Sequence, residues 1–169
     1  LMFSLRRWAG VIAVALLTLV VAVPASIAIA PAELGAGRPT ERVIDDADVF
    51  SRASRSDLES RLEALTEDRV DAHVITVRRL DYGYTLNSFG AELLEQWTET
   101  GEAPLMLVLI ESQGKRAAIV ADASLQSRLP EALLKSTART TMAIPLREGD
   151  RYRQASVDGL GRISVVLNG

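Results

Sequence analysis

Three closely spaced aspartates, Asp45, Asp46 and Asp48, are the residues whose spacing most suggests chemistry. Such carboxylates can bind a divalent cation such as calcium, which takes about six to eight oxygen ligands, so other loops would have to supply more. The same Asp-x-Asp spacing suits a phosphatase with an aspartate nucleophile, but that chemistry needs a strongly apolar preceding strand and a cationic phosphate site. Only Val43 and Ile44 precede it here. We favour a structural role, because acids before a helix N-terminus are stabilised by about 0.3–1 kcal/mol.

Two further acidic residues lie beside expected strands. Glu102 precedes the apolar segment 104–110, and Asp122 follows the segment 116–121. Side chains just after the strands of open α/β sheets often face a crevice that binds a ligand. Glu102 and Asp122 are therefore candidate partners of Asp45 in a metal site, although each could equally be an ordinary loop acid.

Several other kinds of site are excluded or disfavoured by the sequence. The chain has no cysteine, which excludes disulfides, thiolate metal ligands and thiol nucleophiles. His73 is the one histidine; it lies within an expected strand, so we expect it to be a hydrogen-bonded structural residue. There is no Gly-x-Ser-x-Gly elbow, no Walker A loop and no dinucleotide-binding glycine loop.

The N-terminal residues have the composition of an export signal. Arg6 and Arg7 precede residues 8–32, which carry no charged side chain. Residues 1–30 hold two of the 19 basic residues and none of the 22 acidic ones, so the rest of the chain has a net charge of about −5. That charge disfavours nucleic acid as a partner.

Two fates of the N-terminal segment remain open. Cleavage is expected after Ala28, or alternatively after Ala30. If it is retained, the uncharged segment 8–30 would anchor the protein, because about 20 apolar residues span a bilayer. Residues 31–42 contain Gly35, Gly37 and Pro39 and are predicted to form a linker before a single domain at 43–169.

The apolar segment 104–110 is predicted to be a strand covered on both faces, because it contains no polar side chain and is too short for a buried helix. Segment 72–77 is rich in β-branched residues and predicts a second interior strand, and 116–121 predicts an antiparallel partner after the turn at Gly114. Residues 43–44 are a fourth, short strand candidate.

Four helices are predicted from apolar residues at helical spacing and from capping residues. They run from 52 to 68 with Ser51 as N-cap, from the cap Thr85 to an end at Gly101, from Pro130 to a stop at Pro145, and from 151 to 167. The crossover between 72–77 and 104–110 should be right-handed and make these strands parallel. The expected fold is a three-layer α/β/α sandwich with a central mixed sheet of about four strands.

This ordered set of features resembles the TPM-domain family over residues 43–167. The resemblance is carried by the run Val-Ile-Asp-Asp-Ala-Asp-Val-Phe-Ser at 43–51, the strand ending Thr76-Val77, Trp97, the central strand, Ile144-Pro145, Gly149-Asp150, Tyr152, Ala155 and Gly159. With an export signal before one domain, the chain looks most like the thylakoid-lumen members implicated in photosystem II repair and assembly. The resemblance implies an α/β/α sandwich, a disputed acid phosphatase activity in plant relatives, and a divalent-ion site built from acidic loops.

Two departures from the family pattern bear on this activity. Where many relatives have an acidic, glycine-rich loop before the central strand, this chain has Gly-Glu-Ala-Pro at 101–104, and where relatives have Gly-x-Gly after the next strand it has Ala-Asp-Ala at 121–123. Losing these glycines removes close backbone approach to a phosphate. Asp45, which matches the family's aspartate, is kept.

Three functions are therefore carried forward. The leading hypothesis is a non-catalytic factor of the thylakoid lumen that needs no cofactor and binds photosystem II subunits or assembly intermediates close to the membrane. The second is an acid phosphatase that depends on calcium or another divalent cation and uses Asp45 with Asp122 or Glu102. The third is a generic periplasmic TPM-domain protein.

Overall fold

The computed structural model describes residues 28–98 and 102–169. Four strands form one sheet in the order β2-β3-β5-β6. They are β2 (Val43–Asp45), β3 (Asp71–Val77), β5 (Leu105–Glu111) and β6 (Arg116–Ala121). The strands β2, β3 and β5 are parallel, and β6 is antiparallel to β5. The predicted mixed sheet and its parallel crossover are confirmed.

Every residue of β5 is buried, as predicted for a strand covered on both faces. Met106, Val108 and Ile110 belong to the apolar cluster on one face of the sheet. Leu105, Leu107 and Leu109 belong to the cluster on the other face. Burial of each such side chain contributes about 1.5–3 kcal/mol, so β5 is a principal stabiliser of the fold.

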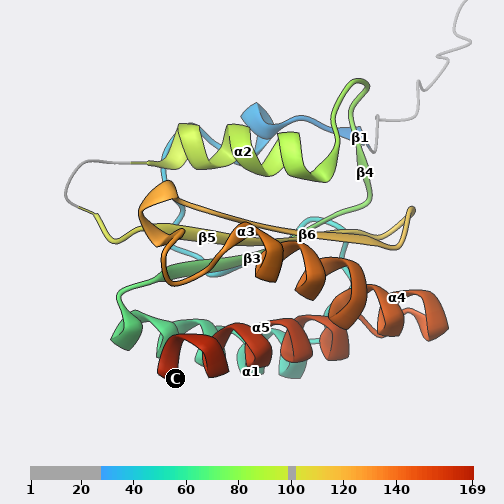
Figure 1. Ribbon diagram of the computed structural model, residues 1–169. Coiled ribbons are helices and arrows are strands. Elements are labelled where there is room, and N and C mark those ends of the chain that lie inside the picture. Colours follow the sequence, from blue (N-terminus) through green and yellow to red (C-terminus); the bar gives the residue numbers. More distant parts are fainter. Residues whose placement is uncertain (1–27, 99–101) are drawn as a thin grey trace, which may run out of the picture.

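Helices cover both faces of the sheet, which confirms the three-layer α/β/α sandwich (Figure 1). On one face lies α2 (Leu86–Trp97), whose buried residues join the cluster of Leu107 and Leu109. The other face is covered by α1 (Arg52–Ala64), α3 (Glu131–Ser136), α4 (Ala143–Gly149) and α5 (Tyr152–Asn168). A 3₁₀ turn, η2 (Leu65–Asp68), completes the predicted helix 52–68.

Two predicted N-caps have the expected geometry. The Oγ of Ser51 accepts a hydrogen bond from the N–H of Ser54 at 3.1 Å, and the Oγ1 of Thr85 accepts one from the N–H of Ser88 at 3.1 Å. Each cap satisfies a backbone donor that the helix itself leaves unpaired. These local signals set where α1 and α2 begin.

The prediction that Pro145 stops a helix is wrong. The helical backbone continues from α3 through a π-helical segment, η4 (Thr137–Met142), into α4, where Pro145 is the third residue. A proline inside a helix removes one N–H from the hydrogen-bond ladder, and its ring crowds the carbonyl four residues earlier. Since η4 interrupts the α-helical pattern just before α4 begins, the proline is accommodated.

The segment predicted as a linker packs against the domain instead. Ala28–Ile29 forms β1, which pairs in parallel with β4 (Arg79–Leu80), and Pro31–Leu34 forms the 3₁₀ turn η1. The indole N–H of Trp97 donates to the carbonyl of Gly35 at 2.9 Å. Order therefore begins before Val43, because an apolar residue, Ile29, and several backbone groups of this segment find partners on the domain.

The remainder of the expected signal or anchor, residues 1–27, lies outside the described residues, so its cleavage and its role in the membrane stay predictions. Among the residues that the structure describes, no helix combines the length and apolarity needed to cross a bilayer.

The contact between α2 and the sheet depends on a glycine. A Cβ atom added to Gly90 would lie 2.5 Å from Cδ1 of Leu109 and 2.7 Å from Cγ2 of Val120, whereas one added to Gly161 in α5 would meet no atom within 4 Å. We expect Gly90→Ala to lower the free energy of unfolding by about 1–2 kcal/mol through overpacking. Gly161→Ala should raise it by about 0.5–1 kcal/mol, because alanine favours helix. Urea unfolding of both variants checks this, and equal effects at the two sites would contradict it.

Candidate functional site

The acidic residues predicted to share one metal site lie at opposite edges of the sheet. Asp45 ends β2 at the carboxyl edge of the parallel strands. Glu102 precedes β5 at the amino edge, and Asp122 follows the antiparallel β6 at that same edge, where its N–H donates to the carbonyl of Leu105 at 2.8 Å. A strand of this length spans roughly 20 Å, so the two groups are far apart. The prediction that Asp45 works with Asp122 or Glu102 is therefore wrong.

The Asp45 carboxylate is buried and engaged by neighbouring donors. Its Oδ1 accepts hydrogen bonds from the N–H of Val49 at 3.1 Å and the hydroxyl of Thr76 at 2.5 Å, and its Oδ2 accepts one from the N–H of Phe50 at 3.0 Å. A guanidinium nitrogen of Arg55 lies 3.5 Å from Oδ2. The side chain has no exposed surface, so it holds the 46–50 loop against β3 rather than presenting a free oxygen.

The other two aspartates of the cluster are exposed and contribute through their backbone. The N–H of Asp46 donates to the carbonyl of Thr76 at 3.1 Å, and the N–H of Asp48 donates to the carbonyl of Asp45 at 3.2 Å. Asp48 has a φ of 53°, in the left-handed region that aspartate and asparagine tolerate best. The loop is thus a turn built on Asp45.

The divalent ion implied by the family resemblance does not fit these five acids as a set. The oxygens of Asp45 already accept hydrogen bonds from three protein donors, and Glu102 and Asp122 lie at the other edge of the sheet. A hard cation needs about six or more oxygens converging on one point. Within residues 28–98 and 102–169, no three acidic or histidine side chains come together in such an arrangement.

Asp122 and Glu102 have separate surroundings at the amino edge. The Oδ1 of Asp122 accepts hydrogen bonds from the N–H and the hydroxyl of Ser124, at 2.9 and 2.8 Å, and so caps the 3₁₀ turn η3 (Ala123–Leu125). These hydrogen bonds, helped by the charge of Arg38, hold the pKa of Asp122 below its usual value. Glu102 is exposed and borders a shallow hollow of about 330 Å³.

That hollow contains a charged network that the sequence did not reveal. One guanidinium nitrogen of Arg38 lies 3.2 Å from Oδ2 of Asp71, and one of Arg42 lies 2.9 Å from Oδ1. The ring of His73 is buried; its Nδ1 lies 2.8 Å from the carbonyl of Glu41, and its Nε2 lies 3.0 Å from Oδ1 of Asp71, although in a direction that does not make a good hydrogen bond. His73 is thus a structural residue, as predicted.

The network controls the ionisation of Asp71. Burial alone would raise the pKa of the Asp71 carboxyl, but contact with the His73 ring and the charges of Arg38 and Arg42 outweigh burial and leave the pKa below its usual value. The spacing of residues in the sequence does not indicate this charged network, because Arg38 and Arg42 come from the segment predicted as a linker. Their partner Asp71 stands at the start of β3.

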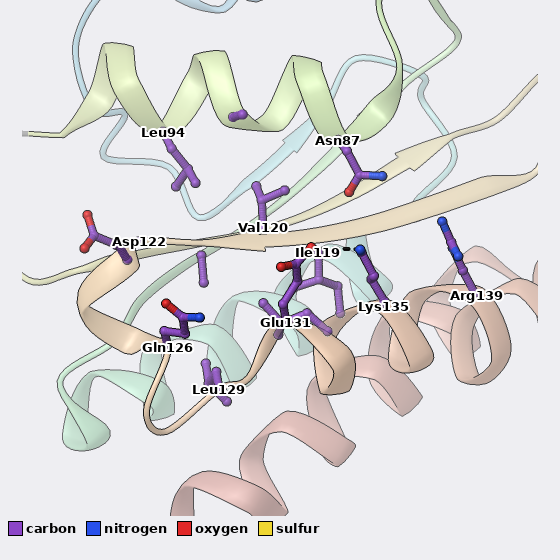
Figure 2. A pocket seen from close by; sticks show the side chains of 14 residues that line it. Asn87, Leu94, Ile119, Val120, Asp122, Gln126, Leu129, Glu131, Lys135 and Arg139 are labelled. Atoms are coloured by element: carbon purple, nitrogen blue, oxygen red, sulfur yellow. Dashed lines mark ion pairs between the residues drawn. The ribbon is translucent and has the colours of Figure 1, made fainter.

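A groove of about 510 Å³ runs along the outer edge of β6 (Figure 2). It is bordered by α2, by β6 and by the α3–η4 helix, with side chains that include Asn87, Leu94, Ile119, Gln126, Glu131 and Arg139. A second hollow of about 280 Å³ shares Asn87 and Arg139 with the first and extends to Arg116. The two together follow the whole strand.

Sequence reasoning missed this groove because it considered which residues could do chemistry. The signal that could have found it is the place of 116–121 as the last strand of the predicted sheet, with the uncharged run Ala-Ala-Ile-Val-Ala after Arg116. Exposed sheet edges are normally blocked by charged side chains, prolines or bulges. A binding surface is therefore expected where that protection is missing.

The sequence of this chain is similar to those of plant chloroplastic proteins. It is 30% identical over 141 residues to a chloroplastic UPF0603 protein of Arabidopsis thaliana, and the alignment covers 80% of this chain and 49% of the relative. It is 27% identical over 141 residues to a chloroplastic UPF0603 protein of Oryza sativa subsp. indica, covering 80% of this chain and 46% of the relative. The chain thus spans about half the length of these relatives.

The fold and a family profile agree with that grouping. The solution structure of the N-terminal domain of a protein from P. gingivalis superposes with a TM-score of 0.72 at 23% identity, covering 84% of this chain and 93% of that domain, which shows the shared fold. A sequence profile of the TPM domain matches residues 43–166, which contain the whole four-stranded sheet and the helices that cover it. The chain therefore belongs to the TPM-domain family.

Proposed function

We propose that this protein is a non-catalytic accessory factor of the thylakoid lumen that binds photosystem II subunits or assembly and repair intermediates. One observation carries the non-catalytic part: Asp45 is buried under three hydrogen-bond donors, and the other candidate acids do not converge on it. Binding is the function that a long groove of about 510 Å³ beside a strand edge supports best.

The location and the partner are supported by the relatives and the N-terminal composition. The relatives from Arabidopsis and rice are named as chloroplastic proteins. Residues 1–30 have the composition of an export signal, and if the uncharged stretch that precedes β1 is retained it would keep the domain beside the thylakoid membrane. A factor held there would meet the lumenal surface of membrane-embedded photosystem II.

Affinity purification tests this proposal. A tagged full-length protein, purified from gently solubilised thylakoids, is expected to bring down photosystem II subunits, and deletion of its gene is expected to slow recovery from strong light. If no photosystem II subunit is enriched and recovery is unchanged, the proposal fails. The generic periplasmic alternative would then stand, and the source organism would decide whether thylakoids are relevant at all.

A phosphatase assay separates the proposal from its enzymatic alternative. We expect the purified protein to show no turnover of a generic phosphomonoester above background at acidic pH, with or without calcium. Should turnover occur, Asp46→Asn and Asp48→Asn are the informative variants, because both side chains are exposed. Loss of turnover in these variants would overturn the non-catalytic assignment. Loss only in Asp45→Asn would not be informative by itself, because that variant also disturbs the fold.

A further inference from the structure

The pairing of β6 with β5 fixes which of its backbone groups face outward. The N–H of Asp122 donates to the carbonyl of Leu105, and the antiparallel register pairs Val120 with Leu107 and Ala118 with Leu109. In an antiparallel pair, alternate residues point their N–H and C=O groups toward the neighbouring strand. The alternate set in β6, Ala117, Ile119 and Ala121, therefore points its N–H and C=O groups away from the sheet.

All three outward-facing residues line the groove. Ala117 borders the hollow near Arg116, while Ile119 and Ala121 border the larger one. Throughout the described part of the chain, no group makes a hydrogen bond to the outward N–H or C=O of these residues. The strand carries no proline and one charged side chain, that of Arg116, so its edge lacks the usual protection against strand addition.

The walls of the groove have the right form for a strand. Helix α2 stands above β6 and α3 with η4 stands below it, so the edge lies at the base of a channel (Figure 2). Leu94 and Leu134 supply apolar surface on the two walls, and Ala91 and Ala121 leave room beside the strand. Main-chain hydrogen bonds to such an edge give affinity, and the walls select alternate side chains of the added strand.

Charge gives the groove a direction. Arg139 and Arg147 border it at the Arg116 end, together with the first turn of α2, whose N–H groups carry partial positive charge. In the described chain neither Arg139 nor Arg147 has a carboxylate partner, whereas Arg116 is paired with Glu111 at 2.6 Å. The opposite end is bordered by Asp122, whose carboxylate lies beyond the last residue of β6.

We propose that this groove binds an extended, acidic segment of a partner protein, which adds to β6 as a further antiparallel strand of the sheet. In that orientation the segment runs toward the Arg116 end and places acidic side chains against Arg139 and Arg147. The inference rests on the proposed function in one respect, that the segment belongs to the bound partner. A peptide experiment tests the groove without assuming which protein that partner is, so the two proposals can fail separately.

The probe is a fluorescent nine-residue peptide that begins with lysine, alternates threonine and valine, and ends in two aspartates. We expect it to bind the full-length protein in anisotropy titrations. A version methylated on alternate backbone nitrogens, which cannot complete the strand ladder, should bind at least about tenfold more weakly, as loss of one or more hydrogen bonds implies. The peptide with its aspartates moved to the N-terminal end should also bind more weakly. Equal binding by all three peptides would overturn the proposal.

Proline variants place the binding on β6. Ala117→Pro and Ala121→Pro remove outward N–H groups and leave the β5–β6 hydrogen bonds intact, so both should fold and lose at least about tenfold in peptide affinity. Ala118→Pro is the contrasting variant, because Ala118 pairs with Leu109 and its substitution should unfold the sheet. If folded Ala117→Pro and Ala121→Pro bind like the wild type, the site is not β6. If these variants are not folded, the methylated peptide decides.

Charge reversal and self-association complete the test. Arg139 is exposed, so Arg139→Glu should leave the fold intact. It should lower the affinity for the acidic peptide and raise the affinity for a peptide whose two aspartates are replaced by lysines. The groove could instead be occupied by a second copy of this chain, paired edge to edge through β6. Analytical ultracentrifugation tests this alternative by measuring the oligomeric state. If the wild type is a dimer that binds no peptide, and Ala117→Pro converts it to a monomer, the proposal is overturned in favour of self-association.

Discussion

Replacing Asp45 with alanine is expected to lower the free energy of unfolding by about 3–5 kcal/mol. Each buried donor left without an acceptor costs about 1–3 kcal/mol, and the costs add only in part. The variant leaves the N–H groups of Val49 and Phe50 and the hydroxyl of Thr76 without their acceptor. It also frees the 46–50 loop that leads into α1 at Ser51. Since small domains are stable by about 5–15 kcal/mol, urea unfolding should show a large shift in midpoint.

Matched amide variants distinguish this structural role from a catalytic one. Asp45→Asn keeps the shape of the side chain but offers an amide N–H₂ to one set of donors, so we expect a smaller loss of about 1.5–3 kcal/mol. Asp46→Asn and Asp48→Asn alter exposed side chains and should change stability by no more than about 0.5 kcal/mol. The interpretation fails if Asp45→Asn and Asp46→Asn unfold at the same urea concentration.

Local signals in the sequence were sufficient for most of the fold. The uninterrupted apolar run at 104–110 predicts burial on both faces, since a half-exposed strand would alternate, and the structure buries all of Leu105–Glu111. Ser51 and Thr85 announce helix starts because their side chains replace missing backbone acceptors. Pro145 misled the prediction because the helical backbone reaches α4 through a π-helical segment, which no residue pattern in the sequence indicates.

The candidate site was harder to predict because it depends on the direction of the strands. Asp45 and Asp122 were grouped because each follows a strand, but β2 is parallel to β3 and β5 whereas β6 is antiparallel to β5, so the ends of β2 and β6 lie at opposite edges of the sheet. The predicted topology already contained this separation. By contrast, the pairing of Arg38 with Asp71 joins residues 33 positions apart, and no periodicity in the sequence indicates such a contact.

We expect Arg38→Ala to lower the free energy of unfolding by about 3–4 kcal/mol, as is usual when one partner of a buried charge pair is removed. The side chain is 10% exposed. Its Nε donates to the carbonyl of Trp97 at 3.1 Å, and one terminal nitrogen donates to the carbonyl of Ala103 at 2.7 Å and to Asp71 at 3.2 Å. It thereby joins the N-terminal segment to α2, β3 and the approach to β5.

The substitution Arg38→Lys tests whether geometry or charge matters more in this contact. A lysine keeps the positive charge but lacks the planar fork that reaches two carbonyls and a carboxylate at once, so it should restore only part of the lost stability. Arg42→Ala is the matched control, because among the described residues the Arg42 side chain makes a hydrogen bond only to Asp71, and it is 27% exposed. Its smaller effect is checked in the same urea titrations.

The lowered pKa of Asp71 adds a pH dependence whose sign follows from the direction of the shift. In the unfolded chain an aspartate titrates near about 3.9. Because the folded-state pKa lies below that value, the stability from ionised Asp71 is complete above about pH 4–5 and is lost as the pH falls through the folded-state pKa. The stability difference between wild type and Asp71→Asn should therefore be constant from about pH 5 to 8 and shrink below about pH 4. A difference for Asp71→Asn that is the same at pH 3 and pH 7 would mean that Arg38, Arg42 and His73 do not stabilise the ionised carboxylate, and the network would then hold the N-terminal segment by packing alone.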